Sequence, residues 1–283
     1  MASCASTVAI VTGGASGIGR ALCEALGREG ATVVVADLDA AGARKVASAV
    51  GALGGTGFAA VVDVADRHAV EQLVSTTVAT HGRLDYMFNN AGLSIWGEAR
   101  DMDADDWQRV IDVNLWGVVA GTTSAYRAML SQGSGHIVNT ASIAGLVPSP
   151  LAVPYVTAKH AVVGLSLALR YEAAAHGIKV SVACPGLVRT PFYDTVRVLN
   201  ARREDTLPLL PGPFVTPERA ARAILRGVKR NRAVIAFPWL ARSAWRIHRL
   251  QPALLRPTMR SAVERFRRIS SSPHRGVMGV PEA

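Results

Sequence analysis

The chain has 283 residues, of which 49% are hydrophobic and 18% are charged. Such a chain is long enough to bury a large core, and its composition excludes global disorder. The formal net charge is +10, but residues 1–194 hold 13 basic and 16 acidic side chains, whereas residues 195–283 hold 18 and 5. We therefore expect a nearly neutral body followed by a basic C-terminal segment.

The sequence also excludes several other classes of protein. Cys4, Cys23 and Cys184 have unrelated spacings, which excludes a disulfide scaffold and a Cys-based zinc site and is typical of a reducing compartment. The histidines show no metal-ligand spacing, so no metal site is expected. Residues 1–19 lack the basic start of a secretion signal, and no predominantly apolar run reaches about 18 residues. The sequence thus predicts a cytoplasmic protein without a spanning helix.

The body alternates short β-branched runs with helical patterns from its first residues onward. Its apolar runs lack polar alternation, which is typical of strands covered on both faces of a parallel sheet. This order predicts an α/β protein with a doubly wound, mainly parallel sheet of about seven strands and helices on both faces, the Rossmann architecture. Strands are expected at Val8–Thr12, Thr32–Ala36, Phe58–Val62, Leu84–Asn89, His136–Thr140, Lys179–Ala183 and Ala233–Phe237, and helices at, for example, Arg20–Glu29, Ala69–Thr80, Ala104–Ser131 and Pro154–His176.

The turn after the first expected strand has the composition of a dinucleotide cradle. It reads Thr12-Gly-Gly-Ala-Ser16-Gly17-Ile18-Gly19 and leads into a helix. Glycines at positions 13, 17 and 19 allow a tight turn and a close approach of the backbone to a pyrophosphate, while the helix N-terminus offers N–H groups to it. A simple glycine turn has the same composition, so the context must decide between the two readings.

That context is an acidic residue at the end of the second strand. Asp37 lies 20 residues after Gly17, where a carboxylate can accept hydrogen bonds from the adenosine ribose. It would repel the 2′-phosphate of NADP, and no Arg stands at position 16 or 38 to bind one. NAD is therefore favoured over NADP, although a surface-turn aspartate is the alternative for Asp37. Asp63 and Val64 end the third strand, where an adenine amino group could be met.

Three residues carry the chemistry that the sequence suggests. Tyr155 and Lys159 are four apart in a helical segment and share one face. A free tyrosine, with a pKa of about 10, is a poor base near neutrality, but a nearby ammonium stabilises its phenolate. Ser142 follows a strand whose carboxyl end faces the ligand crevice, so its hydroxyl could hold a substrate oxygen. An exposed helix face would also show the Tyr155–Lys159 spacing.

Several motifs follow one another in a single order. They are Thr12-Gly-x-x-x-Gly-Ile-Gly19, Asn89-Asn90-Ala91-Gly92, Asn114 within Val-Asn-Leu, Ser142, Tyr155-x-x-x-Lys159, and Pro185-Gly186 with Thr190. Over roughly residues 5–240, the chain resembles the short-chain dehydrogenase/reductase family, and no expected motif is missing.

The resemblance implies a role for each catalytic residue. Tyr155 would be the general acid/base, and Ser142 would orient the substrate carbonyl or hydroxyl. Lys159 would hold the nicotinamide ribose and lower the pKa of Tyr155. Asn114 would kink its helix and fix a water in the proton relay, or simply satisfy helix backbone groups. The implied cofactor-binding residues are Gly13, Ser16, Gly17, Ile18, Gly19, Asp37, Asp63, Val64, Asn90, Ala91, Gly92, Tyr155, Lys159, Pro185, Gly186, Val188 and Thr190.

The loops that border the substrate in this family are mainly apolar here, with Arg197, Arg202 and Arg203 nearby. Their apolar residues are Leu93, Ile95, Trp96, Leu146, Val147, Phe192, Tyr193, Val196, Leu207, Leu209, Leu210 and Phe214. We expect an NAD-dependent oxidoreductase that transfers a hydride between nicotinamide and a hydrophobic secondary alcohol or ketone, such as a lipid, sterol or terpenoid. The alternatives are an NADP-dependent carbonyl reductase and a non-catalytic dinucleotide-binding or membrane-associated protein, which the intact catalytic residues disfavour.

One catalytic domain is expected over residues 1–237, with a substrate loop at about 187–215, and a basic amphipathic extension over residues 238–283. In the extension, a helix over Leu240–Gln251 would place an apolar line opposite a basic one, and a second apolar line follows. The first line is Leu240, Ala244, Ile247 and Gln251, and the second is Met259, Val263 and Phe266.

Two alternatives stay open for the role of the extension. Residues 238–268 could lie on an anionic membrane surface, or their helices could pack on this chain or a partner subunit. Nucleic acid is not expected, because no recognition motif accompanies the arginines. Residues 270–283 are expected to be disordered. By analogy with the family, the long helices near 104–131 and 154–176 would form a homodimer or homotetramer.

Overall fold

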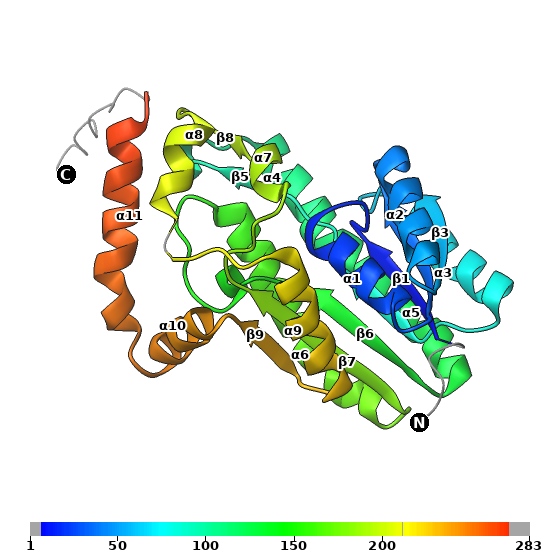
Figure 1. Ribbon diagram of the computed structural model, residues 1–283. Helices are drawn as coiled ribbons and strands as arrows, with labels where there is room; N and C mark the ends of the chain where they lie inside the picture. Colours follow the sequence, from blue (N-terminus) through cyan, green and yellow to red (C-terminus); the bar gives the residue numbers. More distant parts are fainter. Residues whose placement is uncertain (1–6, 211, 272–283) are drawn as a thin grey trace.

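The computed structural model describes residues 7–210 and 212–271. Within them, seven parallel strands form one sheet in the order β3-β2-β1-β4-β6-β7-β9 (Figure 1). All seven strands expected from the sequence are present, with ends that differ from the prediction by no more than two residues. They are β1 (Val8–Thr12), β2 (Thr32–Asp37), β3 (Thr56–Val61), β4 (Tyr86–Asn89), β6 (Gly135–Thr140), β7 (Ile178–Pro185) and β9 (Val234–Phe237).

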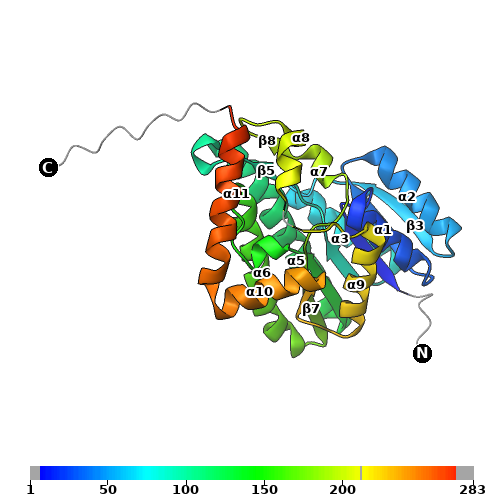
Figure 2. The ribbon, with the colours of Figure 1, turned by 60° about the vertical axis from the view of Figure 1, so that its left-hand side comes forward.

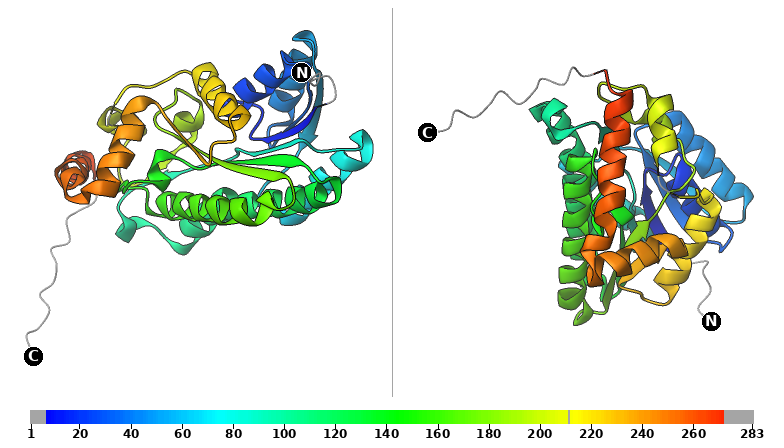
Figure 3. Two further views of the ribbon diagram at one scale, coloured as in Figure 1. Left: turned by 90° about the horizontal axis from the view of Figure 1, so that it is seen from below. Right: turned by 90° about the vertical axis from the view of Figure 1, so that its left-hand side faces the viewer.

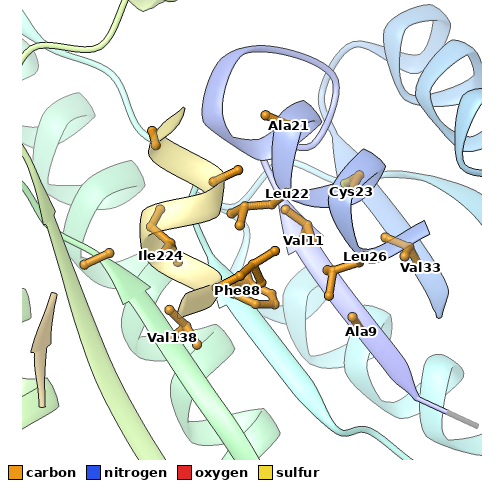
Figure 4. Close-up of a cluster of buried hydrophobic side chains, with 14 of the residues drawn as sticks. Ala9, Val11, Ala21, Leu22, Cys23, Leu26, Val33, Phe88, Val138 and Ile224 are labelled. Carbon is orange, nitrogen blue, oxygen red and sulfur yellow. The ribbon is translucent and has the colours of Figure 1, made fainter. Parts of the chain in front are cut away.

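Helices cover both faces of this sheet. α1, α2 and α9 pack on one face, and α3, α5 and α6 on the other (Figure 3, left). On the first face, Leu22 of α1 and Ile224 of α9 join Phe88 of β4 in one buried cluster (Figure 4). The double cover explains why the central strands are apolar along their length. The helices are α1 (Gly17–Gly27), α2 (Ala40–Ala52), α3 (Arg67–His81), α5 (Gly117–Gln132), α6 (Val153–Ala174) and α9 (Pro217–Lys229).

The sheet reverses its winding direction at β1. β2 pairs with one side of this strand and β4 with the other, so the connections leave β1 in opposite directions. In open sheets of this kind, ligands bind at the carboxyl ends of the strands beside such a switch point. The loops that follow β1, β2, β3, β4, β6 and β7 all reach this edge, which brings together residues that are far apart in the sequence.

The segment expected as one helix over 104–131 is three pieces. α4 (Ala104–Ile111) and α5 are joined by a π-helical turn, Asp112–Trp116, which contains Asn114. The apolar periodicity continues across the turn, so a pattern count cannot see the extra residue that a π turn inserts.

Short elements of the substrate loop lie outside the main sheet. β5 (Ile95–Trp96) pairs in parallel with β8 (Arg197–Val198), and the loop also holds α7 (Phe192–Thr195), α8 (Arg203–Thr206) and a 3₁₀ turn at Leu207–Leu209. Arg197 donates to the buried Asp106 carboxylate at 2.6 Å, which ties β8 to α4. This arginine is therefore engaged with the protein itself.

The basic tail folds as α10 (Trp239–Leu250), a 3₁₀ turn (Pro252–Leu255) and α11 (Arg256–Ile269). The apolar face predicted for α10 is wrong by one residue. Ala241 is buried and Trp245 packs on the cluster around Val182, whereas Leu240 and Ile247 are exposed. The reason is that Ala241 and Trp245, four apart, let the helix lie close to the body and bury the larger indole.

α11 stands beside α8 at the edge of the molecule (Figure 2). Phe266 is fully buried, and Arg267 donates to Glu98 at 2.7 Å. Of the residues expected to be disordered, 270–283, the structure describes Ser270 and Ser271, and the Ser271 backbone N–H donates to the Asn200 carbonyl at 2.7 Å. Residues 272–283 lie outside the described part. No helix within the described residues combines the length and apolar character that crossing a bilayer requires.

Candidate active site

The glycine turn after β1 forms a cradle at the start of α1. Gly17 has φ +53°, and a methyl group there would lie 3.0 Å from Thr190 Cβ, so only glycine lets the turn pass beneath the β7 loop. Backbone N–H groups at the start of α1 have no intrahelical partner and face the strand ends. The local sequence thus builds a site suited to a phosphate group.

Asp37 lies at the end of β2 beside this cradle. Its carboxylate accepts hydrogen bonds from the backbone N–H of Ala15 at 2.9 Å and of Asp39 at 3.0 Å. These bonds hold the side chain against the turn while each oxygen retains further acceptor capacity. The position suits a hydroxyl-bearing ligand next to the phosphate cradle, and the charge opposes a second phosphate.

Thr12 joins the ends of β1 and β4. Its Oγ1 accepts from the backbone N–H of Asn90 at 2.9 Å and of Ala91 at 3.1 Å, and donates to the Phe88 carbonyl at 3.4 Å. The Asn90 side-chain amide donates in turn to the Thr12 carbonyl at 3.1 Å. These bonds fix the loop after β4 against the cradle.

Ser142, Tyr155 and Lys159 converge at the centre of the same edge. Ser142 follows β6, and its Oγ accepts from the Ala144 N–H at 3.1 Å. Lys159 is buried, and its Nζ donates to the Thr140 carbonyl at 2.9 Å and lies 5.5 Å from the centre of the Tyr155 ring. The helix face that carries Tyr155 and Lys159 is therefore directed toward the site and not toward solvent.

Burial dominates the electrostatics of these groups. It raises the pKa of Tyr155 to about 12, partly opposed by a hydrogen bond with Ser142. It lowers the pKa of Lys159 from 10.5 to about 8, partly opposed by Cys184. The expected lowering of the Tyr155 pKa is therefore not met in this structure. At neutral pH the phenol is protonated and the amine is an ammonium ion.

Asn114 lies beside this group on the π-helical turn. Its amide donates to the Leu93 carbonyl at 2.8 Å and to the Val110 carbonyl at 3.0 Å, while its buried Oδ1 has no partner among the described residues. A methyl group on Gly92 would lie 2.7 Å from Asn114 Oδ1 and 3.5 Å from Lys159 Nζ. Gly92 therefore lets a free acceptor and the ammonium face the same small space.

A cavity of about 360 Å³ connects the cradle with the catalytic groups. Every residue predicted to bind the cofactor or to act in catalysis lines it, with the exception of Gly19. Gly19 is buried behind the turn, where a side chain would overlap the Gly13 carbonyl, so close packing requires glycine at this position. The lining residues from the prediction are Gly13, Ser16, Gly17, Ile18, Asp37, Asp63, Val64, Asn90, Ala91, Gly92, Asn114, Ser142, Tyr155, Lys159, Pro185, Gly186, Val188 and Thr190.

Several lining residues were not predicted. Leu38, Val62 and Val113 give the far end of the cavity an apolar wall next to Asp37 and Asp63. Each of these residues is next to a predicted one in the sequence. Adjacency to the motifs was therefore the signal that could have found them. Such a wall suits a flat aromatic base.

A second cavity of about 180 Å³ continues from Ser142 and Tyr155 toward the outside of the molecule. Of the residues expected to border the substrate, Trp96, Phe192, Tyr193, Leu209 and Leu210 line it. The others do not; Leu93 lines the larger cavity, and Leu146 packs in a buried cluster beneath. Arg197, Arg202 and Arg203 are also absent from its wall. Arg197 pairs with Asp106, and Arg202 and Arg203 lie 3.8 and 3.6 Å from Glu204.

The tail supplies part of this second wall, which sequence reasoning missed. Thr258, Met259, Ala262 and Arg265 of α11 line the cavity. The amphipathic spacing of the tail was visible in the sequence, but its docking against the substrate loop was not.

Comparison with known proteins agrees with this geometry. The family model for short chain dehydrogenases matches residues 7–198. EphD of Mycobacterium tuberculosis (strain H37Rv) is 34% identical over 91% of this chain, which spans only 45% of that longer protein. SadH of the same organism is 32% identical over 94% of this chain and 98% of its own length. Cyclohexanol dehydrogenase of Acinetobacter is 41% identical over 65% of this chain and 74% of its own length.

A solved structure shows the same fold. The short chain dehydrogenase/reductase of Burkholderia phymatum, determined in complex with NAD, superposes with a TM-score of 0.80. It is 27% identical, and the match covers 88% of this chain and 94% of that one.

Proposed function

The chain belongs to the short chain dehydrogenase family, and we propose that it uses NAD to interconvert a hydrophobic secondary alcohol and its ketone by a Ser142–Tyr155–Lys159 mechanism. The observation that carries this proposal is the convergence of those three side chains on a cavity that is continuous with the glycine cradle. The family's oxidoreductases act on alcohol and ketone groups, and the cavity offers both a place for the oxygen and a proton donor.

Asp37 is the basis for choosing NAD over NADP. Its carboxylate is held at the cradle by the Ala15 and Asp39 N–H groups, where it can accept the ribose hydroxyls. Leu38, which follows it, is 68% exposed and offers no cation for a 2′-phosphate. The NAD complex of the Burkholderia phymatum enzyme, which has the same fold, supports the same choice.

In the proposed mechanism, NAD bound in the larger cavity would supply the hydride chemistry. Ser142 donates a hydrogen bond to the substrate oxygen and fixes its position. In ketone reduction, the protonated Tyr155 phenol gives its proton to the oxygen as negative charge develops there. In alcohol oxidation, Tyr155 takes that proton, and the Lys159 ammonium stabilises the phenolate that must form first.

Lys159 and Asn114 support this proton transfer. With one N–H engaged by the Thr140 carbonyl, the Lys159 ammonium has two further donors, which suit the hydroxyls of the nicotinamide ribose. Asn114 Oδ1 is free to accept from a water that would lie between it and the ammonium. This arrangement provides a path for the proton away from Tyr155.

The second cavity supports a hydrophobic substrate. Trp96, Phe192 and Tyr193 pack edge to face around it, with ring centres 5.4 to 6.1 Å apart. Cyclohexanol dehydrogenase, one of the relatives, is named for a hydrophobic secondary alcohol. We propose the same substrate class here, which includes lipid, sterol and terpenoid alcohols.

The test is a panel of hydrophobic secondary alcohols and ketones, assayed by nicotinamide absorbance with NAD and NADP in parallel. We expect turnover with NAD preferred, and a loss of 10²- to 10⁴-fold in kcat in Tyr155→Phe. The exposed Tyr171→Phe serves as the matched control and leaves kcat unchanged. Unchanged turnover in Tyr155→Phe contradicts the mechanism, and a preference for NADP contradicts the role of Asp37.

Two associations of the chain also stay proposals. Self-association through α5 and α6 is supported by exposed apolar side chains on them, Leu130 and Tyr171; light scattering that shows a monomer contradicts it. Binding to an anionic membrane is supported by the exposed Trp239, Leu250 and Leu254 among the tail arginines. Flotation with anionic and neutral vesicles tests it, and Trp239→Ser with Leu250→Ser should abolish flotation.

A further inference from the structure

The outer wall of the substrate cavity comes from the tail. Four residues of α11 face the cavity, while Ser142 and Tyr155 lie in the wall formed by the body. Most of the remaining lining is apolar and aromatic. The cavity therefore reaches from Tyr155 to α11, so that a substrate held by Tyr155 would have side chains of α11 near its far end.

Among the described residues that line this cavity, Arg265 is the only charged one. It is half-buried, and its Nε donates a long bond of 3.3 Å to the Ser261 carbonyl of its own helix. Within residues 7–210 and 212–271, no carboxylate forms an ion pair with it. By contrast, Arg267 pairs with Glu98, and Arg197 pairs with Asp106. The guanidinium thus keeps its bidentate donor face available to a ligand.

A second polar residue lines the same cavity from the body. Ser94, in the loop between β4 and β5, is 4% exposed, lines the cavity, and its Oγ has no partner among the described residues. A buried hydroxyl without a partner costs free energy that a bound ligand can recover. The cavity therefore offers two unsatisfied polar contacts in a wall that is otherwise mainly apolar.

From these contacts we propose that Arg265 binds a carboxylate carried by the substrate, and that Ser94 makes a further hydrogen bond to it. The substrates would be oxo or hydroxy carboxylic acids with an apolar chain between the reacting carbon and the acid. The guanidinium matches a carboxylate bidentately, and the apolar surroundings strengthen the pairing. This inference rests on the proposed alcohol–ketone function and specifies its substrate.

The experiment compares acids with neutral partners of the same chain. 4-Oxopentanoate, 6-oxoheptanoate and 8-oxononanoate are assayed with NADH beside their methyl esters. For at least one chain length, we expect the acid to exceed the ester at least tenfold in kcat/KM. Arg265→Met lowers kcat/KM for that acid by about 10- to 100-fold and changes the ester less than threefold. Arg265→Lys gives an intermediate value for the acid.

The matched control is Arg268→Met, an exposed arginine on the same helix that lines neither cavity. We expect this variant to leave kcat/KM unchanged for both the acid and the ester. Equal use of acid and ester by the wild-type protein at every chain length overturns the inference. An equal fall in kcat/KM for acid and ester in Arg265→Met also overturns the inference, because that result means that the arginine only holds α11 in place.

A binding measurement separates this inference from the proposed function. Heptanoate and heptanamide carry no ketone, so their affinities, measured by calorimetry with NADH present, do not depend on turnover. We expect heptanoate to bind at least tenfold more tightly than the amide, and Arg265→Met to remove that difference. If no ketone in the panel is reduced, the proposed function fails while this measurement still decides the role of Arg265. Equal affinities of the wild-type protein for heptanoate and heptanamide overturn the proposed role of Arg265.

Discussion

The body of the molecule, through β9, and the tail of α10 and α11 reach the same substrate cavity in different ways. In the body, each functional side chain follows a strand or lies on a helix packed against the sheet, so hydrogen bonds and burial on all sides fix its position. In the tail, four side chains of one helix contribute a single wall. In our proposals, the body carries out the reaction and the tail contributes to the choice of substrate.

Side-chain capping varies among the helices. Aspartates cap α2, α3 and α4 through their side chains, and Thr216 caps α9, whereas α1, α5 and α6 of the body have no side-chain cap among the described residues. In the described structure, neither α10 nor α11 has a side-chain cap. Tail helices therefore depend on contacts with the body, chiefly Phe266, Trp245 and the Arg267–Glu98 pair. Whether the tail can open without unfolding the sheet is tested below by Phe266→Ala.

The largest expected effect is that of Lys159→Met, which separates function from stability within the body. We expect kcat to fall by about 10²- to 10⁴-fold, because the ammonium stabilises the Tyr155 phenolate in the proposed mechanism. Burial lowers the pKa of Lys159 from 10.5 to about 8, so keeping the charge buried costs on the order of 3 kcal/mol at pH 7. The variant should be more stable there by up to this amount, less the hydrogen bond to Thr140.

The contribution of Lys159 to the free energy of unfolding should depend on pH. Between about pH 8 and 10.5, the unfolded chain holds a proton on Lys159 that the folded chain does not, so wild-type stability gains from this group as pH rises. Lys159→Met should lack that contribution, and the exposed Lys179→Met should keep it. Urea unfolding at several pH values measures both, and identical pH profiles for Lys159→Met and the wild type contradict the prediction.

Phe266→Ala breaks the attachment of the tail. Removal of a fully buried phenylalanine costs about 3–5 kcal/mol, and here we expect the loss to appear as local opening of α11. Hydrogen exchange should accelerate in residues 256–269, KM for substrates should rise, and NAD affinity should stay unchanged. Leu254→Ala, which removes a 63% exposed side chain, is the control. A parallel loss of NAD binding would mean that tail and body are one cooperative unit.

Asp37→Asn sharpens the assignment of the cofactor to the body. The substitution keeps one carbonyl acceptor but removes the charge that opposes a 2′-phosphate. We expect the Kd for NAD to rise about 10-fold and the preference for NAD over NADP to fall by a similar factor or more. Asp39→Asn neutralises a neighbouring charge and retains the cap of α2, so it should leave the preference intact. An unchanged preference in Asp37→Asn argues against the role of this carboxylate.

The smallest effect is expected for Asp66→Ala, which removes a cap from α3. The carboxylate accepts from His68 and Ala69 N–H at 2.9 and 3.2 Å, so its loss should lower the free energy of unfolding by about 1 kcal/mol. Activity should not change, because α3 lies away from the cavity. Glu71→Ala, exposed on the same helix, should have a smaller effect in urea unfolding. A larger effect from Glu71→Ala would show that propensity or charge, and not the cap, governs this helix.

Much of the site could be predicted because its residues occur in motifs whose spacing follows from local geometry. Tyr155 and Lys159 share a helix face by a four-residue spacing, and Gly17 is required by its left-handed φ. The same motif assigns Gly19 to the cofactor, and the structure shows that this glycine is also required for packing against the Gly13 carbonyl. A motif shows that a residue is needed, but it does not show which neighbour needs it.

The Tyr155 pKa and the tail illustrate what spacing does not contain. Residue spacing places Lys159 near Tyr155, but the desolvation that raises the Tyr155 pKa depends on burial by several elements at once. Likewise, α10 shows apolar residues on two adjacent lines, and the body selects the line that holds Ala241 and Trp245. Both outcomes depend on contacts between distant parts of the chain.

The sequence by itself determined the parallel sheet, the glycine turn after β1 and the proposed catalytic trio, because hydrophobic period, glycine placement and helical spacing are properties of short segments. Only the tertiary structure decided that Arg265, more than 100 residues beyond Tyr155 in the chain, lines the same cavity. The physical reason is that docking of α11 depends on the combined surface of α8 and the substrate loop, which exists only once the chain has folded.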